Sequence, residues 1–229
     1  MDTVIAYMPS ILDGAFVTVA VALGSLLISV LLGLLGAWAK LSKSLLAQKV
    51  GLAYTTLIRG VPDLVLMLLL FFGGQQLLNQ VGRDTGWWGY VEIDQFTAGV
   101  LTIGFIFGAY MTETFRGAYL SIPRGQVEAG IACGMSPPKI FGRIIWPQLV
   151  RYALPSFGNN WLVLLKTTAL VSVLSLQELV YNSFTAGRST RQLFTFMFVA
   201  LIVYLVLTAI SDVGLRWLDR KYSAGVRRA

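Results

Sequence analysis

Residues 14–39 read GAFVTVAVALGSLLISVLLGLLGAWA, a run of 26 residues without a charged side chain. A helix needs about 20 predominantly apolar residues to cross the hydrocarbon core of a bilayer. Inside a bilayer every backbone N–H and C=O group needs a partner within the protein, and a helix satisfies these groups along its own length. This stretch therefore predicts a transmembrane helix and, with it, an all-α membrane protein.

The composition of the whole chain agrees with this fold class. Of its 229 residues, 56% are hydrophobic and only 13% are charged, whereas soluble domains carry about 25% charged residues. Histidine is absent and Cys133 is the only cysteine, which excludes histidine triads, HExxH zinc sites and an intrachain disulfide. No Gly-Lys pair is present, so the chain has no Walker A loop. We therefore expect a protein that is not an enzyme and that has no metal or cofactor site of its own.

Apolar runs predict a single transmembrane domain, residues 1–229, with five helices. Each run has close to the length that a spanning helix needs. Lys166 interrupts the fourth run, which makes it the least regular. The expected spans are about 11–39, 54–78, 95–121, 154–177 and 192–215.

The distribution of lysine and arginine predicts the orientation, because short loops rich in these residues stay in the cytoplasm. Most of them lie beside the spans on one side, which also argues against nucleic acid as the reason for the net charge of +7. The other side holds only Arg83, Arg188 and Arg191. We expect the N-terminus outside and the C-terminus inside, with these cytoplasmic basic residues: Lys40, Lys43, Lys49, Arg124, Lys139, Arg143, Arg151, Arg216, Arg220, Lys221, Arg227 and Arg228.

The inner segment 122–150, between the third and fourth spans, reads as a helix, a break and a second helix. Pro137 and Pro138 end the first helix, because proline cannot continue one. A thin helix lets another protein approach its backbone closely. The alternative is an amphipathic helix that rests on the inner membrane surface. The small residues that make the first helix thin are Ala129, Gly130, Ala132, Cys133 and Gly134.

This segment resembles the EAA motif of ABC importer permeases, whose pattern is E-A-A-x3-G-x9-I-x-L-P. Here Gly130 stands in place of the second alanine and Trp146 in place of the leucine. The matching residues are Glu128-Ala129-Gly130, Gly134 and Ile144-x-Trp146-Pro147.

Three further stretches resemble the polar amino-acid branch of that family. They are RGVP (59–62), GAYMTETFRGAYLSIPRGQ (108–126) and LLKTTALVS (164–172). The chain is most similar to the histidine/lysine/arginine/ornithine type of permease, in which a carboxylate follows the RG-x-P element. Asp63 stands at that position.

The resemblance implies a transport subunit of the bacterial inner membrane, surrounded by lipid, that binds no ATP itself. It implies a second homologous permease subunit, two cytoplasmic ATP-binding subunits and a periplasmic substrate-binding protein. The predicted function is a permease for basic amino acids such as arginine, ornithine, lysine or histidine. There are two alternatives. One is an ABC permease for another polar amino acid or an opine, and the other is an ion-coupled secondary transporter. The residues implied to contact the ATPases are Glu128, Ala129, Gly130, Gly134, Ile144 and Pro147.

Five residues in or beside the spans are candidates for the substrate site. A charged residue facing lipid at the centre of a span costs about 2.5–3.5 kcal/mol on insertion scales, so the wall of a passage is preferred. Two of the five, a methionine and a tyrosine, are equally compatible with simple packing. The candidates are Asp63, Met67, Tyr110, Glu113 and Lys166.

The charged candidates have alternative interpretations. Asp63 is expected to recognise a cationic substrate, but it can also be an interfacial carboxylate that is exposed to water or paired with Arg59. Glu113 can pair with Arg116, three residues later on the same helical face, in a structural or gating role. Lys166 can face a carboxylate or carbonyl of a partner, or it can hold a substrate carboxylate.

Two features are expected on the outer side. Glu178, near the outer end of the fourth span, is expected to add negative potential to the entrance. The loop RDTGWWGYVEIDQ (83–95) carries two tryptophans and a tyrosine. These aromatic residues predict a belt at the membrane interface, with docking of a partner as the alternative.

Overall fold

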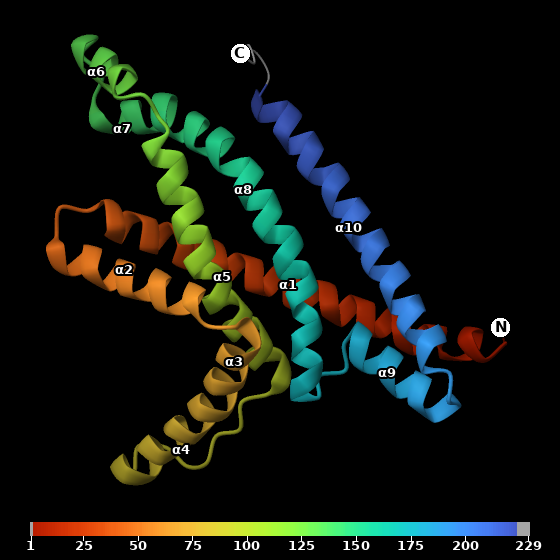
Figure 1. Ribbon diagram of the computed structural model, residues 1–229. Coiled ribbons are helices and arrows are strands. Elements are labelled where there is room, and N and C mark those ends of the chain that lie inside the picture. Colours follow the sequence, from red (N-terminus) through yellow and green to blue (C-terminus); the bar gives the residue numbers. More distant parts are fainter. Residues whose placement is uncertain (1, 224–229) are drawn as a thin grey trace.

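The computed structural model describes residues 2–223, and in this part of the chain helices are joined by short segments without a β-strand (Figure 1). Arg227 and Arg228, which belong to the predicted cytoplasmic tail, lie outside the described residues. The elements in chain order are α1 (Asp2–Leu41), α2 (Leu45–Gly60), α3 (Asp63–Leu68), the π-helical η1 (Leu69–Gly73), α4 (Gly74–Thr85), α5 (Gln95–Leu120), α6 (Arg124–Ala132), α7 (Pro137–Ile140), the π-helical η2 (Phe141–Ile145), α8 (Trp146–Thr167), the 3₁₀-helical η3 (Thr168–Leu174), α9 (Leu179–Thr190) and α10 (Leu193–Ser223).

Five helical stretches of the described chain are long and apolar enough to cross a membrane. The prediction of an all-α protein with five spans is therefore confirmed, whereas its orientation remains a prediction. Most of the observed stretches extend beyond the bounds of the spans expected from the sequence. The polar residues that end each apolar run are still helical. The five stretches are Thr3–Leu41, Asp63–Thr85, Gln95–Leu120, Pro137–Leu174 and Leu193–Tyr222.

The second span does not run as one helix from residue 54 to 78, as we expected. α2 ends at Gly60, Val61 is extended (φ −115°, ψ 141°), and α3 starts at Asp63 directly after Pro62. Proline lacks the N–H that would continue α2, but its fixed φ suits the start of a new helix. The spanning stretch therefore begins at Asp63, and α2 lies beside the C-terminal half of α1 as a separate helix (Figure 1).

α5 is the most buried of the five spans and crosses α1 (Figure 1). In its most apolar window 61% of the residues are buried, compared with 11% in α10. Glycines make the crossing close: a Cβ on Gly104 of α5 would lie 2.7 Å from the Cβ of Ile28. Gly36 of α1 faces Thr112 of α5 in the same way. Small residues of this kind allow helix backbones to pack closely in a membrane.

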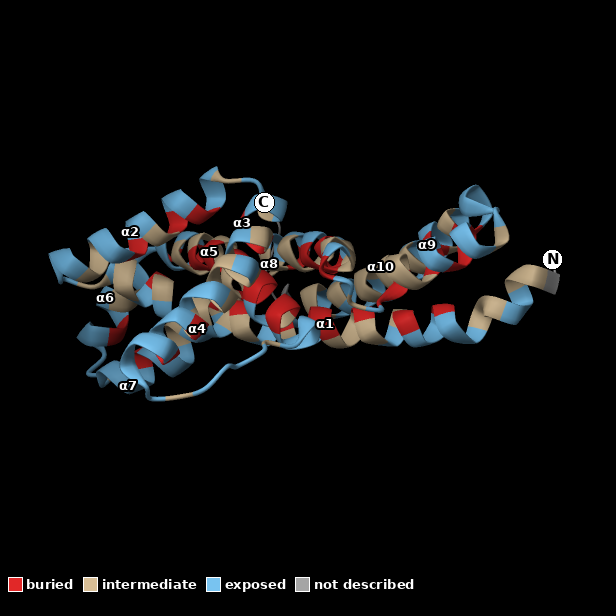
Figure 2. Ribbon diagram, turned by 90° about the horizontal axis from the view of Figure 1, so that it is seen from below, coloured by how far each residue is buried: buried red, intermediate tan, exposed pale blue. Residues whose placement is uncertain are grey.

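Exposed residues follow the outward faces of the helices (Figure 2), and many of them are large and apolar. Phe16 of α1 and Phe194 of α10 are 75% and 84% exposed. Lipid tails are as apolar as these side chains, so their exposure carries little penalty in a bilayer. The exposed apolar surface is thus consistent with a protein that lipid surrounds.

The loop between α4 and α5, which is predicted to lie outside, is held against α4 by side chains of that helix. The Asn79 amide accepts a hydrogen bond from the Val91 N–H at 2.8 Å and donates one to the Val91 carbonyl at 2.9 Å. The indole of Trp88 turns inward and donates to the Leu78 carbonyl at 3.2 Å. Trp87 and Tyr90 are 80% and 77% exposed, so they are available either to a membrane interface or to a partner.

The glycine contacts generate a prediction about packing. We expect Gly104→Val to destabilise the protein by about 1–3 kcal/mol, because the new side chain would overlap Ile28 across the α1–α5 crossing. Gly117→Val is the matched control on the same helix, since no atom lies within 4 Å of its missing Cβ. The midpoint of thermal unfolding, followed by size-exclusion chromatography in detergent, is the measurement. Equal midpoints for the two variants would contradict the close crossing.

Candidate functional site

The inner segment that was expected to contact another protein folds as α6, α7, η2 and the start of α8. α6 ends in a Schellman motif: the Gly134 N–H donates to the Ile131 carbonyl at 2.9 Å and the Met135 N–H donates to the Gly130 carbonyl at 3.0 Å. Gly134 has a φ of +73°, which glycine adopts without the steric cost of a Cβ. Gly134 therefore ends the helix, a role that the motif spacing alone did not predict.

Gly130 has a packing role within the same segment. It is buried, and a Cβ there would lie 2.8 Å from Cδ1 of Ile144. Two members of the predicted contact set, Gly130 and Ile144, thus contact each other. The other small residues of this helix and its C-terminal cap remain exposed: Ala129, Ala132, Cys133 and Gly134. The surface that another protein can approach closely is therefore narrower than the sequence suggested.

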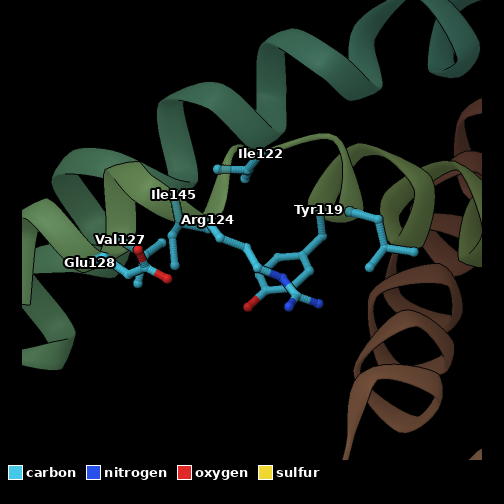
Figure 3. A pocket seen from close by; sticks show the side chains of 7 residues that line it. Tyr119, Ile122, Arg124, Val127, Glu128 and Ile145 are labelled. Carbon is cyan, nitrogen blue, oxygen red and sulfur yellow. The ribbon is translucent and has the colours of Figure 1, made fainter.

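A cavity of about 410 Å³ lies between α5, α6 and η2 at the base of this surface (Figure 3). Ile122, Val127 and Ile145 contribute its apolar lining, and Arg124 and Glu128 add one charge of each sign. In Figure 3 the side chain of Arg124 extends beside the ring of Tyr119, whereas the carboxylate of Glu128 lies away from both, at the other end of the set of lining side chains. Pro147, at the start of α8, is exposed. Exposed charges around an apolar floor suit the docking of another protein.

A network of charged groups joins α1, α2 and α5. Lys40 donates to Oγ1 of Thr55 at 2.9 Å and forms an ion pair with Glu113. The other carboxylate oxygen of Glu113 accepts from Nε of Arg116 at 3.0 Å. The side chains of Lys40 and Glu113 are only 11% and 21% exposed. The Glu113–Arg116 pair was predicted from the helical spacing. The pairing of Lys40 with Glu113 was not, because Lys40 lies 73 positions earlier and its neighbours in the sequence indicate only a basic residue at a membrane boundary.

This network forms one side of a second cavity, of about 480 Å³. Tyr110 and Arg59 also line it, and the guanidinium carbon of Arg59 lies 5.4 Å from the centre of the Tyr110 ring. Asp63 is half-buried at the start of α3, three residues beyond Gly60, which lines the cavity as well. Within residues 3–222 no ion pair joins Asp63 to Arg59, so the expected alternative of such a pair is wrong.

The other two candidates for the substrate site lie elsewhere. Met67, the fifth residue of α3, is fully buried, with 0% exposure, in the main hydrophobic core. It therefore does not line the cavity in this conformation. Lys166 is exposed on α8, and the described chain offers it no carboxylate within ion-pair distance.

Glu178 is not at an open entrance, as we expected, but buried with 1% exposure. Its carboxylate caps the N-terminus of α9 by accepting from the N–H groups of Val180 and Tyr181 at 3.0 and 2.8 Å. The Thr18 hydroxyl donates to it at 3.2 Å. Burial raises the pKa of the Glu178 carboxyl in spite of these hydrogen bonds. The expected contribution to the potential of the entrance is wrong, because this carboxylate satisfies backbone groups instead.

Comparison with known proteins connects these features to a family. Residues 29–224 match the family described as binding-protein-dependent transport system inner membrane component. The histidine/lysine/arginine/ornithine transport system permease protein HisQ of Escherichia coli (strain K12) is 50% identical over 219 residues, which cover 96% of each chain. The octopine transport system permease protein OccQ of Rhizobium meliloti is 43% identical over 211 residues, which cover 92% of this chain and 89% of the relative.

Two solved structures share the fold. A crystal structure of an amino acid ABC transporter with histidines contains a chain that matches with a TM-score of 0.80 and 28% identity, over 95% of this chain and 96% of that one. The MetNI methionine ABC transporter, in an inward-facing conformation, matches with a TM-score of 0.67 and 16% identity, over 92% of this chain and 97% of that one. The second likeness concerns the fold alone.

The charged network generates a prediction about stability. We expect Glu113→Gln to destabilise the protein by about 1–3 kcal/mol, because it leaves the mostly buried Lys40 ammonium without its countercharge. Removing both partners avoids that unpaired charge, so the double variant Lys40→Met/Glu113→Gln should unfold at a higher temperature than Glu113→Gln alone. Differential scanning fluorimetry of the purified variants in one detergent measures both differences. A double variant less stable than the single one would show that the two residues do not act as a pair.

Proposed function

This chain belongs to the family of binding-protein-dependent transport system inner membrane components, and we propose from that premise that it forms the path by which an ATP-driven importer carries basic amino acids. It is a multi-pass inner membrane protein and a transport subunit. The observation that carries the substrate class is Asp63, a carboxylate that stands beside a cavity at a helix break and has no ion-pair partner in the described chain.

The setting of Asp63 supports a passage wall. Backbone that departs from a helix within the membrane is tolerated only where it is covered by protein or lines a water-filled space. The break at Val61 and Pro62 meets that condition beside the cavity. One fixed carboxylate attracts arginine, lysine, ornithine and protonated histidine, and the ring of Tyr110 adds a face that favours cations. These substrates agree with the name of the E. coli relative.

Opines are the second candidate substrate class. Permeases of octopine and nopaline transport systems are 43% and 40% identical to this chain. Both of these opines retain the guanidinium of arginine, so the same carboxylate would attract them. Family membership disfavours the remaining alternative, an ion-coupled secondary transporter.

The family implies ATP-binding subunits and a substrate-binding protein as partners. In detail, we propose two ATP-binding subunits on the cytoplasmic side, which bind the ATP, and a second homologous permease subunit beside this one. Lys166 supports the second permease, because it is exposed in the last turn of α8 and an ammonium that faces lipid within a spanning stretch is costly. A neighbouring subunit that covers this exposed residue would remove most of that cost.

The docking surface for the ATP-binding subunits is proposed to be the exposed face of α6 and the cavity at its base. Ala129 and Ala132 offer a thin surface, Glu128 and Arg124 offer charges, and the Schellman motif fixes the end of the helix. α6 is joined to α5, which carries Tyr110 on the cavity wall. Movement of the ATP-binding subunits would therefore reach the substrate cavity through α5, provided that α6 lies on the cytoplasmic side.

The role of Asp63 generates a prediction about uptake. We expect Asp63→Asn to lower the uptake of radiolabelled arginine into vesicles containing the full transporter by at least about tenfold, the effect of losing one charge-assisted hydrogen bond. Histidine measured at high pH, where it is neutral, should lose less. Asp84→Asn, which removes an exposed carboxylate from the end of α4, is the matched control. Equal losses for arginine and neutral histidine would mean that Asp63 does not recognise charge.

The docking surface generates a prediction about assembly. We expect Ala129→Trp to reduce co-purification of the ATP-binding subunits at least about tenfold, since a bulky side chain prevents close approach to the helix backbone. Thr185→Trp, at an exposed position of α9 on the predicted outer side, should have no such effect.

Cys133 provides a second measurement, because it is exposed on the same surface and the chain has no other cysteine. A membrane-impermeant thiol reagent should label Cys133 from the cytoplasmic side, more strongly in Ala129→Trp than in the assembled wild type. Labelling from the outer side would reverse the orientation and exclude this docking surface.

A further inference from the structure

Arg59 is the charged residue that the proposed function leaves without a role. It lies in the last turn of α2, it is exposed, and it lines the 480 Å³ cavity. The other charged groups on that cavity, Lys40, Glu113 and Arg116, are paired with one another. Within residues 3–222 no carboxylate forms an ion pair with Arg59. The cavity thus has one guanidinium that is free to receive an anion.

The helix break explains why Arg59 and Asp63 do not neutralise each other. Residues four positions apart on one continuous helix are neighbours, and opposite charges at that spacing usually pair. Here Val61 is extended and Pro62 starts a new helix, so the two side chains belong to different helices, α2 and α3. The break keeps a cation and an anion close in sequence but unpaired.

Tyr110 lies within reach of both charges. The Arg59 guanidinium is over its ring at 5.4 Å from the centre, and α3, which begins at Asp63, packs against α5, the helix that carries Tyr110. Both charges, unpaired within residues 3–222, therefore lie on elements that pack around one half-buried aromatic side chain of α5. A ligand bound beside that ring would meet the positive charge of Arg59, with the negative charge of Asp63 at the adjoining helix break.

Resting on the proposed function, we propose that Arg59 binds the α-carboxylate of the substrate while Asp63 binds its cationic side chain. Guanidinium and carboxylate match in shape and form paired, charge-assisted hydrogen bonds. The cavity volume of about 480 Å³ is within the range of about 300–1,000 Å³ for small-molecule sites. The ligand class is an α-amino acid or opine that carries a carboxylate at one end and a cation at the other.

This arrangement selects against cations that lack a carboxylate. Agmatine, the decarboxylated form of arginine, keeps the guanidinium that Asp63 recognises but leaves Arg59 unpaired. A ligand without a carboxylate forgoes the paired, charge-assisted hydrogen bonds that the Arg59 guanidinium would make, and it therefore binds more weakly. The pair Arg59–Asp63 therefore distinguishes amino acids from polyamines, which Asp63 alone does not.

The test measures equilibrium binding of radiolabelled arginine to the assembled transporter in lipid nanodiscs, without the substrate-binding protein. Unlabelled agmatine and 5-guanidinopentanoate, which keeps the carboxylate but lacks the α-amino group, compete for the site. In the wild type, 5-guanidinopentanoate should compete at least about tenfold better than agmatine. In Arg59→Gln, arginine affinity should fall at least about tenfold to the level of agmatine, whose own affinity stays unchanged. Arg59→Lys should retain part of the preference, and Lys49→Gln, which removes an exposed cation of the same helix, should retain all of it.

Three outcomes would overturn the inference. If Arg59→Gln lowers the affinities for arginine and agmatine equally, Arg59 has a structural role. If it changes neither affinity, the carboxylate site lies elsewhere, including on the second permease. Equal competition by agmatine and 5-guanidinopentanoate in the wild type would also contradict the inference. Failure of the proposed function is separate: in that case Asp63→Asn leaves the affinities of both arginine and agmatine unchanged.

Discussion

Glycines at the crossing of α1 and α5 let the two helix backbones approach closely, and the positions of the charged groups depend on that approach. Gly104 and Gly36 are in direct contact with side chains of the opposite helix. The crossing holds Lys40, near the end of α1, against Glu113 of α5. Charges in or near hydrocarbon are costly unless a countercharge and hydrogen bonds accompany them. Apolar packing and charge pairing therefore support each other at this end of the bundle.

The proposed substrate cavity lies between a network of paired charges and a helix break. The network consists of Lys40, Glu113 and Arg116, in which every charge has a partner. The break separates α2 from α3, and the two charged residues beside it, Arg59 and Asp63, form no ion pair within residues 3–222. Paired charges cost a membrane protein little, whereas unpaired ones are tolerated where they meet water or a ligand. This contrast separates the residues that hold the cavity together from those that are available to a substrate.

The inner segment lies at one end of α5 and α8, and the outer loop and α9 lie at the other (Figure 1). Within the segment, Gly134 fixes the end of α6 and Gly130 lets Ile144 pack against it. Both glycines thus give the segment a defined shape, and the exposed alanines are left as its outer surface. The segment is joined to α5, which also carries Tyr110 on the wall of the 480 Å³ cavity.

The sequence by itself determined the fold class, the number of spans and the family, because uncharged runs of about 20 residues and the spacing of the EAA motif are properties of contiguous residues. It also pointed to Asp63, since a carboxylate at the start of an apolar run is visible without a structure. The roles of Gly134, Met67 and Glu178 were decided only by the tertiary structure: a left-handed turn, a place in the core and a buried helix cap. The pairing of Glu113 with Lys40 was likewise decided only by the tertiary structure. A membrane makes apolar patterns strict along the chain, but it leaves the choice of partner for each polar group to the way distant helices pack, and Lys40 meets Glu113 only because α1 and α5 cross closely.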